Sequence, residues 1–225
     1  RVLVADVANR TRMEAIFRET QPQVVFHAAA YKQPQLMEDY VSEALQTNLL
    51  GTINVADLAL QYKAGRMILI STDKAAHPVR AVEYSKRLSE IYVQSLGQKV
   101  QAEETGGSQL MVVRFGDVYP EDPHSLMTLP EACMLILEAG MTGDTGEVYI
   151  FEETGKVLSV PTCHEKIKRE LSSVYDYERI HTLLSAIIKR SYAEKTAILL
   201  SEIKKIMPDL AVFPIISEDM HKKTF

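Results

Sequence analysis

Three short, continuous apolar runs dominate the first half of the chain, and helix-length segments separate them. They occupy residues 24–29, 67–71 and 110–114. Such runs without polar alternation are typical of parallel strands, which are buried on both faces of the sheet. Segments with a helical pattern, at 10–19, 41–62 and 84–97, fill the intervals. The alternation of strand and helix predicts a doubly wound α/β fold.

The pattern changes after residue 116. Residues 129–139 are expected to be helical, 147–151 to form a strand, and 165–207 to be helical again. Within the last segment, 177–190 and 193–207 each carry one apolar stripe, which predicts a helical hairpin on the main body or on a partner subunit. We therefore expect a sheet domain at 1–160 and a mainly helical extension at 161–225.

The first six residues, Arg1 to Asp6, are expected to form a strand that is already under way.

Composition excludes several classes of protein. A content of 46% hydrophobic residues in 225 residues is enough for a buried core, and the net charge of −5 gives no basic field for nucleic acid. Cys133 and Cys163 support neither a disulfide framework nor a metal site, so a cytoplasmic location is expected. No apolar run approaches the roughly 20 residues of a membrane span, so any membrane attachment would need segments outside this chain. A homo-oligomer is the expected assembly.

Ligands of open α/β sheets lie over the carboxyl ends of the strands, so the residues there are candidate site residues. At the first such end, Asp6 either accepts a hydrogen bond from an adenine ring, with Val7 packed on the ring, or starts a helix. At the second, three small residues at 28–30 either let a ligand approach the backbone or only pack. His27 is expected to be a hydrogen-bonded core histidine.

The third strand end places Ser71, Thr72, Asp73 and Lys74 side by side. A hydroxyl, a carboxyl and an amine together can perform acid and base chemistry on a bound substrate. The alternative is a plain turn in which Asp73 caps the backbone. In the helix that follows, Lys86 either faces inward and donates to a nicotinamide ribose or is solvated.

Taken together, these motifs resemble one family, the UDP-N-acetylglucosamine 4,6-dehydratases of surface-polysaccharide synthesis, within the extended short-chain dehydrogenase/reductases. The shared strings are HAAAYK at 27–32, TN, GT and N at 47–54, STDKA at 71–75, SKR at 85–87, RFGDV at 114–118 and PEA at 130–132. The resemblance is nearly continuous from Asp6 to Val118. It implies a Rossmann-like fold that binds NAD or NADP and a UDP-sugar substrate.

The resemblance also implies a role for individual residues. The expected cofactor contacts are Asp6, Val7, Ala28, Ala29, Ala30, Ser71 and Lys86. The expected catalytic residues are Thr72, Asp73 and Lys74, and the expected substrate contacts are Lys32, Arg114 and Asp117. In the implied reaction, C4 of the sugar is oxidised, a partly neutral, buried Lys74 takes the C5 proton, and a protonated Asp73 gives one to the leaving 6-hydroxyl.

Four departures from the family pattern leave alternatives open. The glycine-rich phosphate loop is expected before Arg1, and the family's longer substrate loop after Val118 is absent. Val82 stands where short-chain reductases have a catalytic tyrosine, with Tyr84 on another helix face, and Asp117 replaces an asparagine. The alternative functions are a nucleotide-sugar epimerase, which usually needs that tyrosine, and a catalytically inactive NAD-binding regulator or scaffold.

Overall fold

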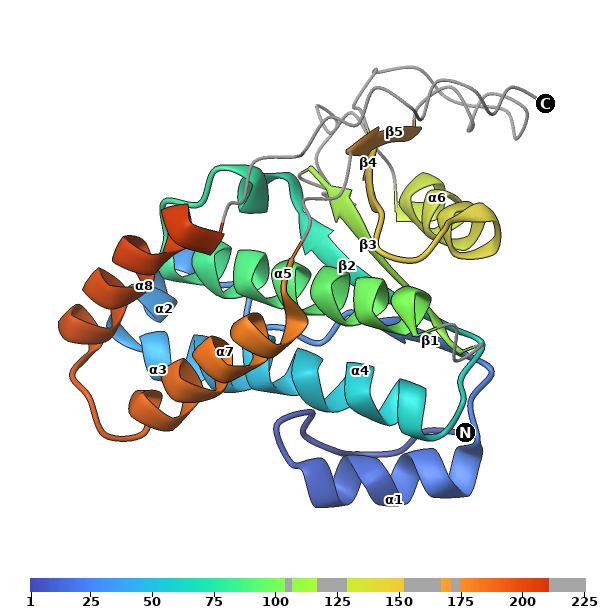
Figure 1. Cartoon of the computed structure of the whole chain (residues 1–225), viewed down its shortest axis with the longest axis horizontal. Coiled ribbons are helices and arrows are strands. Elements are labelled where there is room, and N and C mark those ends of the chain that lie inside the picture. The colour runs from blue at the N-terminus through green and yellow to red at the C-terminus, as the bar shows by residue number, and fades with distance from the viewer. Residues whose placement is uncertain (104–106, 117–128, 152–166, 171–174, 211–225) are drawn as a thin grey trace.

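The computed structural model describes residues 1–103, 107–116, 129–151, 167–170 and 175–210. A central sheet runs through the molecule in the order β1-β2-β3-β4-β5 (Figure 1). The first four strands are parallel and the fifth is antiparallel to the fourth. The strands are β1 (Val24–His27), β2 (Arg66–Thr72), β3 (Gln109–Phe115), β4 (Val148–Phe151) and β5 (Ile167–Glu170).

Helices occupy the predicted intervals with slightly different bounds, and two short helices, at 34–39 and 73–76, were not predicted. They are α1 (Arg10–Thr20), α2 (Pro34–Asp39), α3 (Val41–Ala44), the π-helix η1 (Leu45–Leu50), α4 (Gly51–Gln61), the 3₁₀-helix η2 (Asp73–Ala76), α5 (Ala81–Ala102), α6 (Leu129–Thr142), α7 (Tyr177–Ser191) and α8 (Thr196–Leu210). In the described part of the chain, none of these helices has the length and apolar character needed to cross a bilayer.

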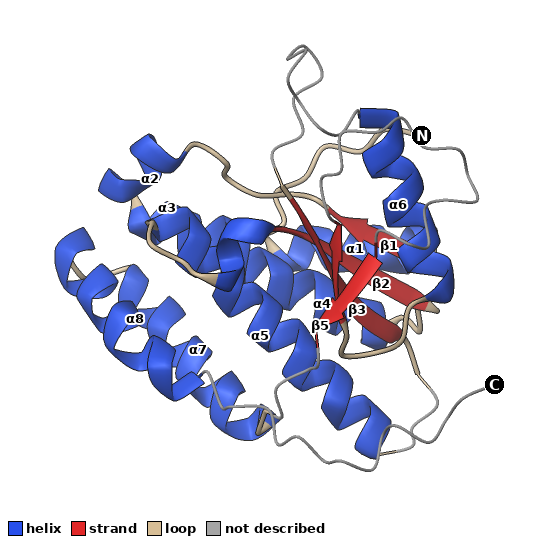
Figure 2. Cartoon of the chain, turned by 90° about the horizontal axis from the view of Figure 1, so that it is seen from above, coloured by secondary structure: helices blue, strands red, loops and turns tan. Residues whose placement is uncertain are grey.

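Helices cover both faces of the sheet, because alternate residues of each strand point to opposite sides. On β2, Met67 and Leu69 join the core beneath α4 and α5, whereas Ile68 joins a second core beneath α6. Figure 2 shows the strands between α6 on one side and α4 and α5 on the other. The predicted doubly wound α/β fold is therefore confirmed.

The predicted helical hairpin is also confirmed. Asp176 caps α7 by accepting a hydrogen bond from the Arg179 N–H at 3.1 Å. The apolar stripe of α7 is buried against α5 and η1, and α8 packs on α7 and α3 (Figure 1). The buried side chains of the two helices include Ile180, Leu184, Ile187, Ile188, Leu199 and Ile203.

Two sequence-based expectations are corrected by the structure. Residues 1–6 form no strand, and Val2 and Val4 are 92% and 88% exposed. Residues 167–170 are not helical, because their backbone pairs with β4 and tertiary pairing overrides a weak local pattern. The predicted division at residue 160 lies outside the described residues and stays a prediction, while β5 pairs with β4 in the sheet and α7 packs on α5.

Candidate functional site

The carboxyl ends of the first three strands meet at one edge of the sheet, because the strands are parallel. His27 at the end of β1 is in register with Leu69, and Thr72 at the end of β2 is in register with Phe115 of β3. Residues 28–33 follow the end of β1, and η2 follows the end of β2. This edge therefore collects the sequence-predicted residues 28–32, 71–74 and 86.

The Thr72–Asp73–Lys74 segment forms a tight turn at the end of β2. Asp73 Oδ1 accepts hydrogen bonds from the Thr72 hydroxyl at 3.0 Å and from the Lys74 N–H at 2.8 Å. Asp73 thus shapes the start of η2, as the capping alternative expected, and both Asp73 and Lys74 are exposed. The burial expected to make Lys74 partly neutral is absent, since its side chain is in contact with solvent.

Lys86 faces the sheet, as predicted, and its side chain is only 7% exposed. Its ammonium donates to the Ile70 carbonyl oxygen of β2 at 3.1 Å, one residue before Ser71. Burial and the positive charge of Lys32 lower the pKa of Lys86 to about 8, while the negative charge of Glu90 raises it. The solvated alternative for Lys86 is therefore excluded.

Asn48 holds the loop after β1 in place, a role that the sequence analysis did not assign to it although it belongs to the shared string TN. Its side-chain oxygen accepts from the Tyr31 N–H at 2.7 Å, and its amide donates to the Tyr31 carbonyl at 3.3 Å and to the Ser85 hydroxyl at 2.8 Å. These bonds leave Ala28 and Ala29 exposed and Ala30 partly exposed at the strand end. The sequence signal for such a role was a polar residue, Asn48, within an otherwise apolar helical pattern.

The segment that contains Asp6 and Val7 is fixed against α4. Asn54 donates to the carbonyl oxygens of Val7 at 3.0 Å and Ala8 at 3.1 Å. A Cβ atom at Gly51 would lie only 2.5 Å from Val7 Cγ2, so the close approach requires glycine. Asp6 is exposed and accepts from the Ala8 N–H at 2.9 Å, and Asn9 rather than Asp6 caps α1.

Arg114 does not point over the end of the sheet. It is 1% exposed, and its Nε and Nη2 donate to the two carboxylate oxygens of Glu90 at 2.9 and 2.7 Å. The Ser71 hydroxyl is buried, and it lowers the pKa of the Glu90 carboxyl. Among the described residues, the hydroxyl oxygen of Ser71 has no hydrogen-bond partner of ordinary geometry. Asp117, the third expected substrate contact, lies outside the described residues.

Val82 and Tyr84 occupy the positions expected from the helical spacing. Val82 is buried against Met37 and Ala44, one turn before Lys86 on the inward face of α5. The Tyr84 ring faces α8, where the Lys204 ammonium lies 5.8 Å from its centroid. Tyr84 therefore does not replace the missing tyrosine.

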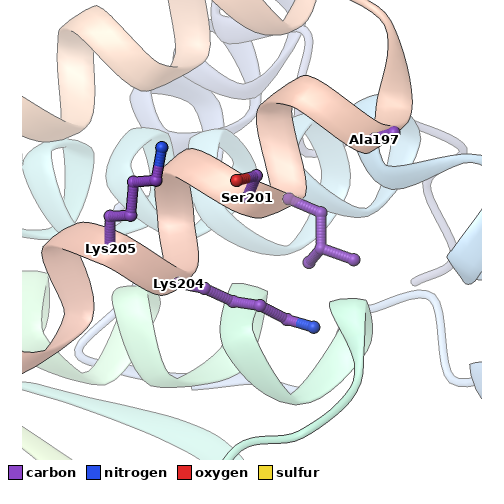
Figure 3. A pocket seen from close by; sticks show the side chains of 5 residues that line it. Ala197, Ser201, Lys204 and Lys205 are labelled. Atoms are coloured by element: carbon purple, nitrogen blue, oxygen red, sulfur yellow. The ribbon is translucent and has the colours of Figure 1, made fainter.

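A shallow groove on α8 is separate from this edge. Ala197, Leu200, Ser201, Lys204 and Lys205 line it (Figure 3). None of the sequence-predicted site residues contributes to it.

His27 is a core histidine, as predicted. Because the Thr52 hydroxyl donates to the Asn48 carbonyl at 2.5 Å, His27 Nε2 donates to Thr52 Oγ1 at 3.0 Å. Burial, together with the positive charge of Lys86, lowers the pKa of His27 to about 3. His27 is therefore neutral in the folded chain at physiological pH.

Acidification is expected to destabilise the fold through His27. Below its ordinary pKa of about 6.5 the unfolded chain binds a proton that the folded chain excludes, so stability falls between pH 6.5 and about 3. Between pH 7 and pH 5 this residue should lower the free energy of unfolding by about 2 kcal/mol. Urea denaturation of wild type and His27→Gln at both pH values measures it. An equal pH dependence in the two proteins would contradict the assignment.

Comparison with known proteins identifies the family. The family described as polysaccharide biosynthesis protein matches residues 1–121. The capsular polysaccharide biosynthesis protein CapD of Staphylococcus aureus is 34% identical over 182 residues, which cover 70% of this chain and 29% of CapD. A UDP-glucose 4-epimerase of Rickettsia rickettsii is 31% identical over 160 residues, 60% of this chain and 46% of the epimerase. The chain thus spans less than half the length of either relative.

A solved structure supports the same fold. The DesIV double mutant from Streptomyces venezuelae, a dTDP-glucose 4,6-dehydratase with NAD bound, superposes with a TM-score of 0.55 at 17% identity, over 68% of this chain and 57% of that protein. At this identity the likeness concerns the fold alone. With more than half of its residues matched by the family, the chain belongs to the polysaccharide biosynthesis protein family.

Proposed function

We propose that this chain forms part of a nucleotide-sugar 4,6-dehydratase, which converts UDP-N-acetylglucosamine to the 4-keto-6-deoxy sugar in surface-polysaccharide synthesis. The observation that carries the proposal is the pairing of two features at one sheet edge. The Thr72–Asp73–Lys74 turn lies at the end of β2, and the Lys86 ammonium lies 3.1 Å from the carbonyl of Ile70 on the same strand. Membership of the family and the likeness to CapD support a role in polysaccharide synthesis.

The residues at this edge suit NAD or NADP. Among the described residues the Lys86 ammonium has one hydrogen-bond acceptor, which leaves two N–H groups to donate to ribose hydroxyls. Ala28, Ala29 and Ala30 present little side-chain bulk beside it. Lys32 adds positive charge close to Lys86, which suits the diphosphate of a dinucleotide or a UDP-sugar. Bound NAD or NADP would accept a hydride from C4 of the sugar while the C4 hydroxyl proton passes to solvent, and would later return the hydride to C6.

The acid and base work then belongs to the η2 turn. Val82 carries no titratable group and cannot take a proton, so the tyrosine route of short-chain reductases is closed to this chain. Lys74 in its neutral form would accept the C5 proton, and Asp73 in its protonated form would give a proton to the departing 6-hydroxyl, which leaves as water. The exposure of both side chains leaves them accessible to a substrate.

An epimerase is the second candidate, and the likeness to the Rickettsia rickettsii UDP-glucose 4-epimerase favours it. The two functions differ in their products, because epimerisation keeps the 6-hydroxyl and dehydration releases it. The experiment is to incubate the full-length protein with UDP-N-acetylglucosamine and to measure the mass of the product by mass spectrometry. A product that is lighter than the substrate by one water supports dehydration. An isomer of unchanged mass would show instead that the protein is an epimerase.

Lys86→Ala is expected to weaken dinucleotide binding. Loss of charge-assisted hydrogen bonds should cost about 1.5–3 kcal/mol, roughly 10- to 150-fold in affinity. The measurement is a titration of NAD and of NADP into the full-length protein. The same substitution at Lys189, an exposed lysine of α7, serves as the control and should leave affinity unchanged. Equal affinities of wild type and Lys86→Ala for both dinucleotides would remove the cofactor assignment.

A further inference from the structure

A row of charged side chains lies between α5 and the carboxyl ends of β2 and β3. Lys86 and Glu90 are four residues apart on the inward face of α5, so they are one turn from each other. Lys86 binds the Ile70 carbonyl of β2, and Glu90 binds Arg114 of β3 through both carboxylate oxygens. Glu90 is fully buried.

Glu90 binds two cationic side chains at once, those of Arg114 and Arg87. Arg87 Nη1 donates to Glu90 Oε2 at 3.0 Å, in addition to the two bonds from Arg114. Burial alone would raise the pKa of Glu90, but the hydrogen bonds and charge of Arg114 and the charge of Arg87 outweigh it and leave this pKa below its usual value. Glu90 is therefore a fixed negative charge inside the molecule.

We propose that Glu90 is a positioning residue for Lys86: held by Arg114, it supplies the buried negative charge that keeps the Lys86 side chain an ammonium directed at the carboxyl end of β2. This inference rests on the proposed function, since it concerns the lysine assigned to the dinucleotide ribose. Glu90 itself lies beneath the sheet edge and acts only through Lys86.

The groups around Lys86 explain why it needs such a partner. From β1, His27 is neutral at physiological pH, because its pKa is about 3. Burial disfavours the positive charge of Lys86, and Lys32 in the loop after β1 repels it as well. From β3, Arg114 bonds to Glu90 and is not among the charges that shift the pKa of Lys86. Among these groups only Glu90 raises the pKa of Lys86, which nevertheless stands at about 8.

The charge of Lys86 can be measured directly. In the full-length protein with carbon-13 at lysine Cε, the NMR signal that disappears in Lys86→Ala reports the titration of Lys86. We expect a midpoint near pH 8 in the wild type. Glu90→Gln removes the negative charge, and the midpoint should fall by about one pH unit or more. As the pH rises, the Glu90→Gln variant should therefore lose dinucleotide affinity at a lower pH than the wild type does.

Two further variants separate this role from simple loss of structure. Glu90→Met combined with Arg114→Met removes the fully buried pair and leaves only the partly exposed Arg87 without its bond to Glu90, and the midpoint of Lys86 should fall here too. Arg87→Gln removes a cation from the same cluster and should not lower the midpoint. A midpoint that stays near the wild-type value in both Glu90 variants, or that falls equally in Arg87→Gln, would overturn the role of Glu90.

The two readouts distinguish this proposal from the proposed function. If the midpoint falls as expected and the wild type binds NAD or NADP, both stand. If the midpoint falls but the wild type binds neither dinucleotide, the electrostatic coupling stands and the cofactor site is lost. If the wild type binds a dinucleotide and the pH dependence of affinity is the same in Glu90→Gln, the positioning role is lost and the proposed function remains.

Discussion

Replacing Asp73 by Asn, or Lys74 by Ala, is expected to slow dehydration of UDP-N-acetylglucosamine by roughly 10²- to 10⁴-fold, the usual contribution of a positioned acid or base. Both side chains lie at the end of β2, exposed toward solvent rather than packed in the core. The substitutions should therefore leave cofactor content and folding unchanged. The measurement is single-substrate turnover by the full-length protein, followed as the loss of water from the sugar.

Matched controls exist elsewhere on the surface. Asp39→Asn, at the end of α2, and Lys189→Ala, on α7, make the same chemical changes at exposed positions away from the η2 turn. Both controls should turn over at the wild-type rate. Wild-type rates in Asp73→Asn or Lys74→Ala would remove that residue from the mechanism, and Asp73 would then keep only its structural role at the start of η2.

The fold was largely predictable because its central parallel strands are covered on both faces. That burial makes β2 and β3 continuous apolar runs, which a sequence pattern shows directly. The run of β1 is equally apolar, although Val24 and Phe26 are exposed in the structure. The strand at 167–170 was not predictable in the same way, because it is short and its conformation depends on pairing with β4. Residues 1–6 have a strand-like composition, but no described strand pairs with them.

The candidate site was predictable where it depends on strand ends and helical spacing. The inward direction of Lys86 follows from its place on the same helix face as Val82, and His27 was expected in the core. The partners of Arg114 were not predictable, because Glu90 lies 24 residues away in sequence and meets it only through the packing of α5 on β3. The role of Asn48, which stands in the shared string TN, was not predictable for a similar reason, since its side chain bonds the Tyr31 backbone and the Ser85 hydroxyl.

Arg114→Met is expected to destabilise the protein by about 3–5 kcal/mol, because it leaves the buried Glu90 carboxylate without its main partner. Arg114 and Glu90 are 1% and 0% exposed, so solvent cannot replace the lost hydrogen bonds. Arg87 would retain one bond to Glu90 Oε2 and moderate the loss. Chemical denaturation at pH 7.5 measures the effect, provided that the slope of the transition stays unchanged.

The double variant Glu90→Met with Arg114→Met decides whether that loss reflects an unpaired charge or lost packing. With both charges gone, two apolar side chains of similar length fill the same space, so most of the stability should return. If the double variant is as unstable as Arg114→Met alone, shape rather than charge dominates at this position. A loss below about 1 kcal/mol in the single variant would show that Glu90 takes up a proton or a new partner instead, and Glu90 would then not be a fixed negative charge beneath Lys86.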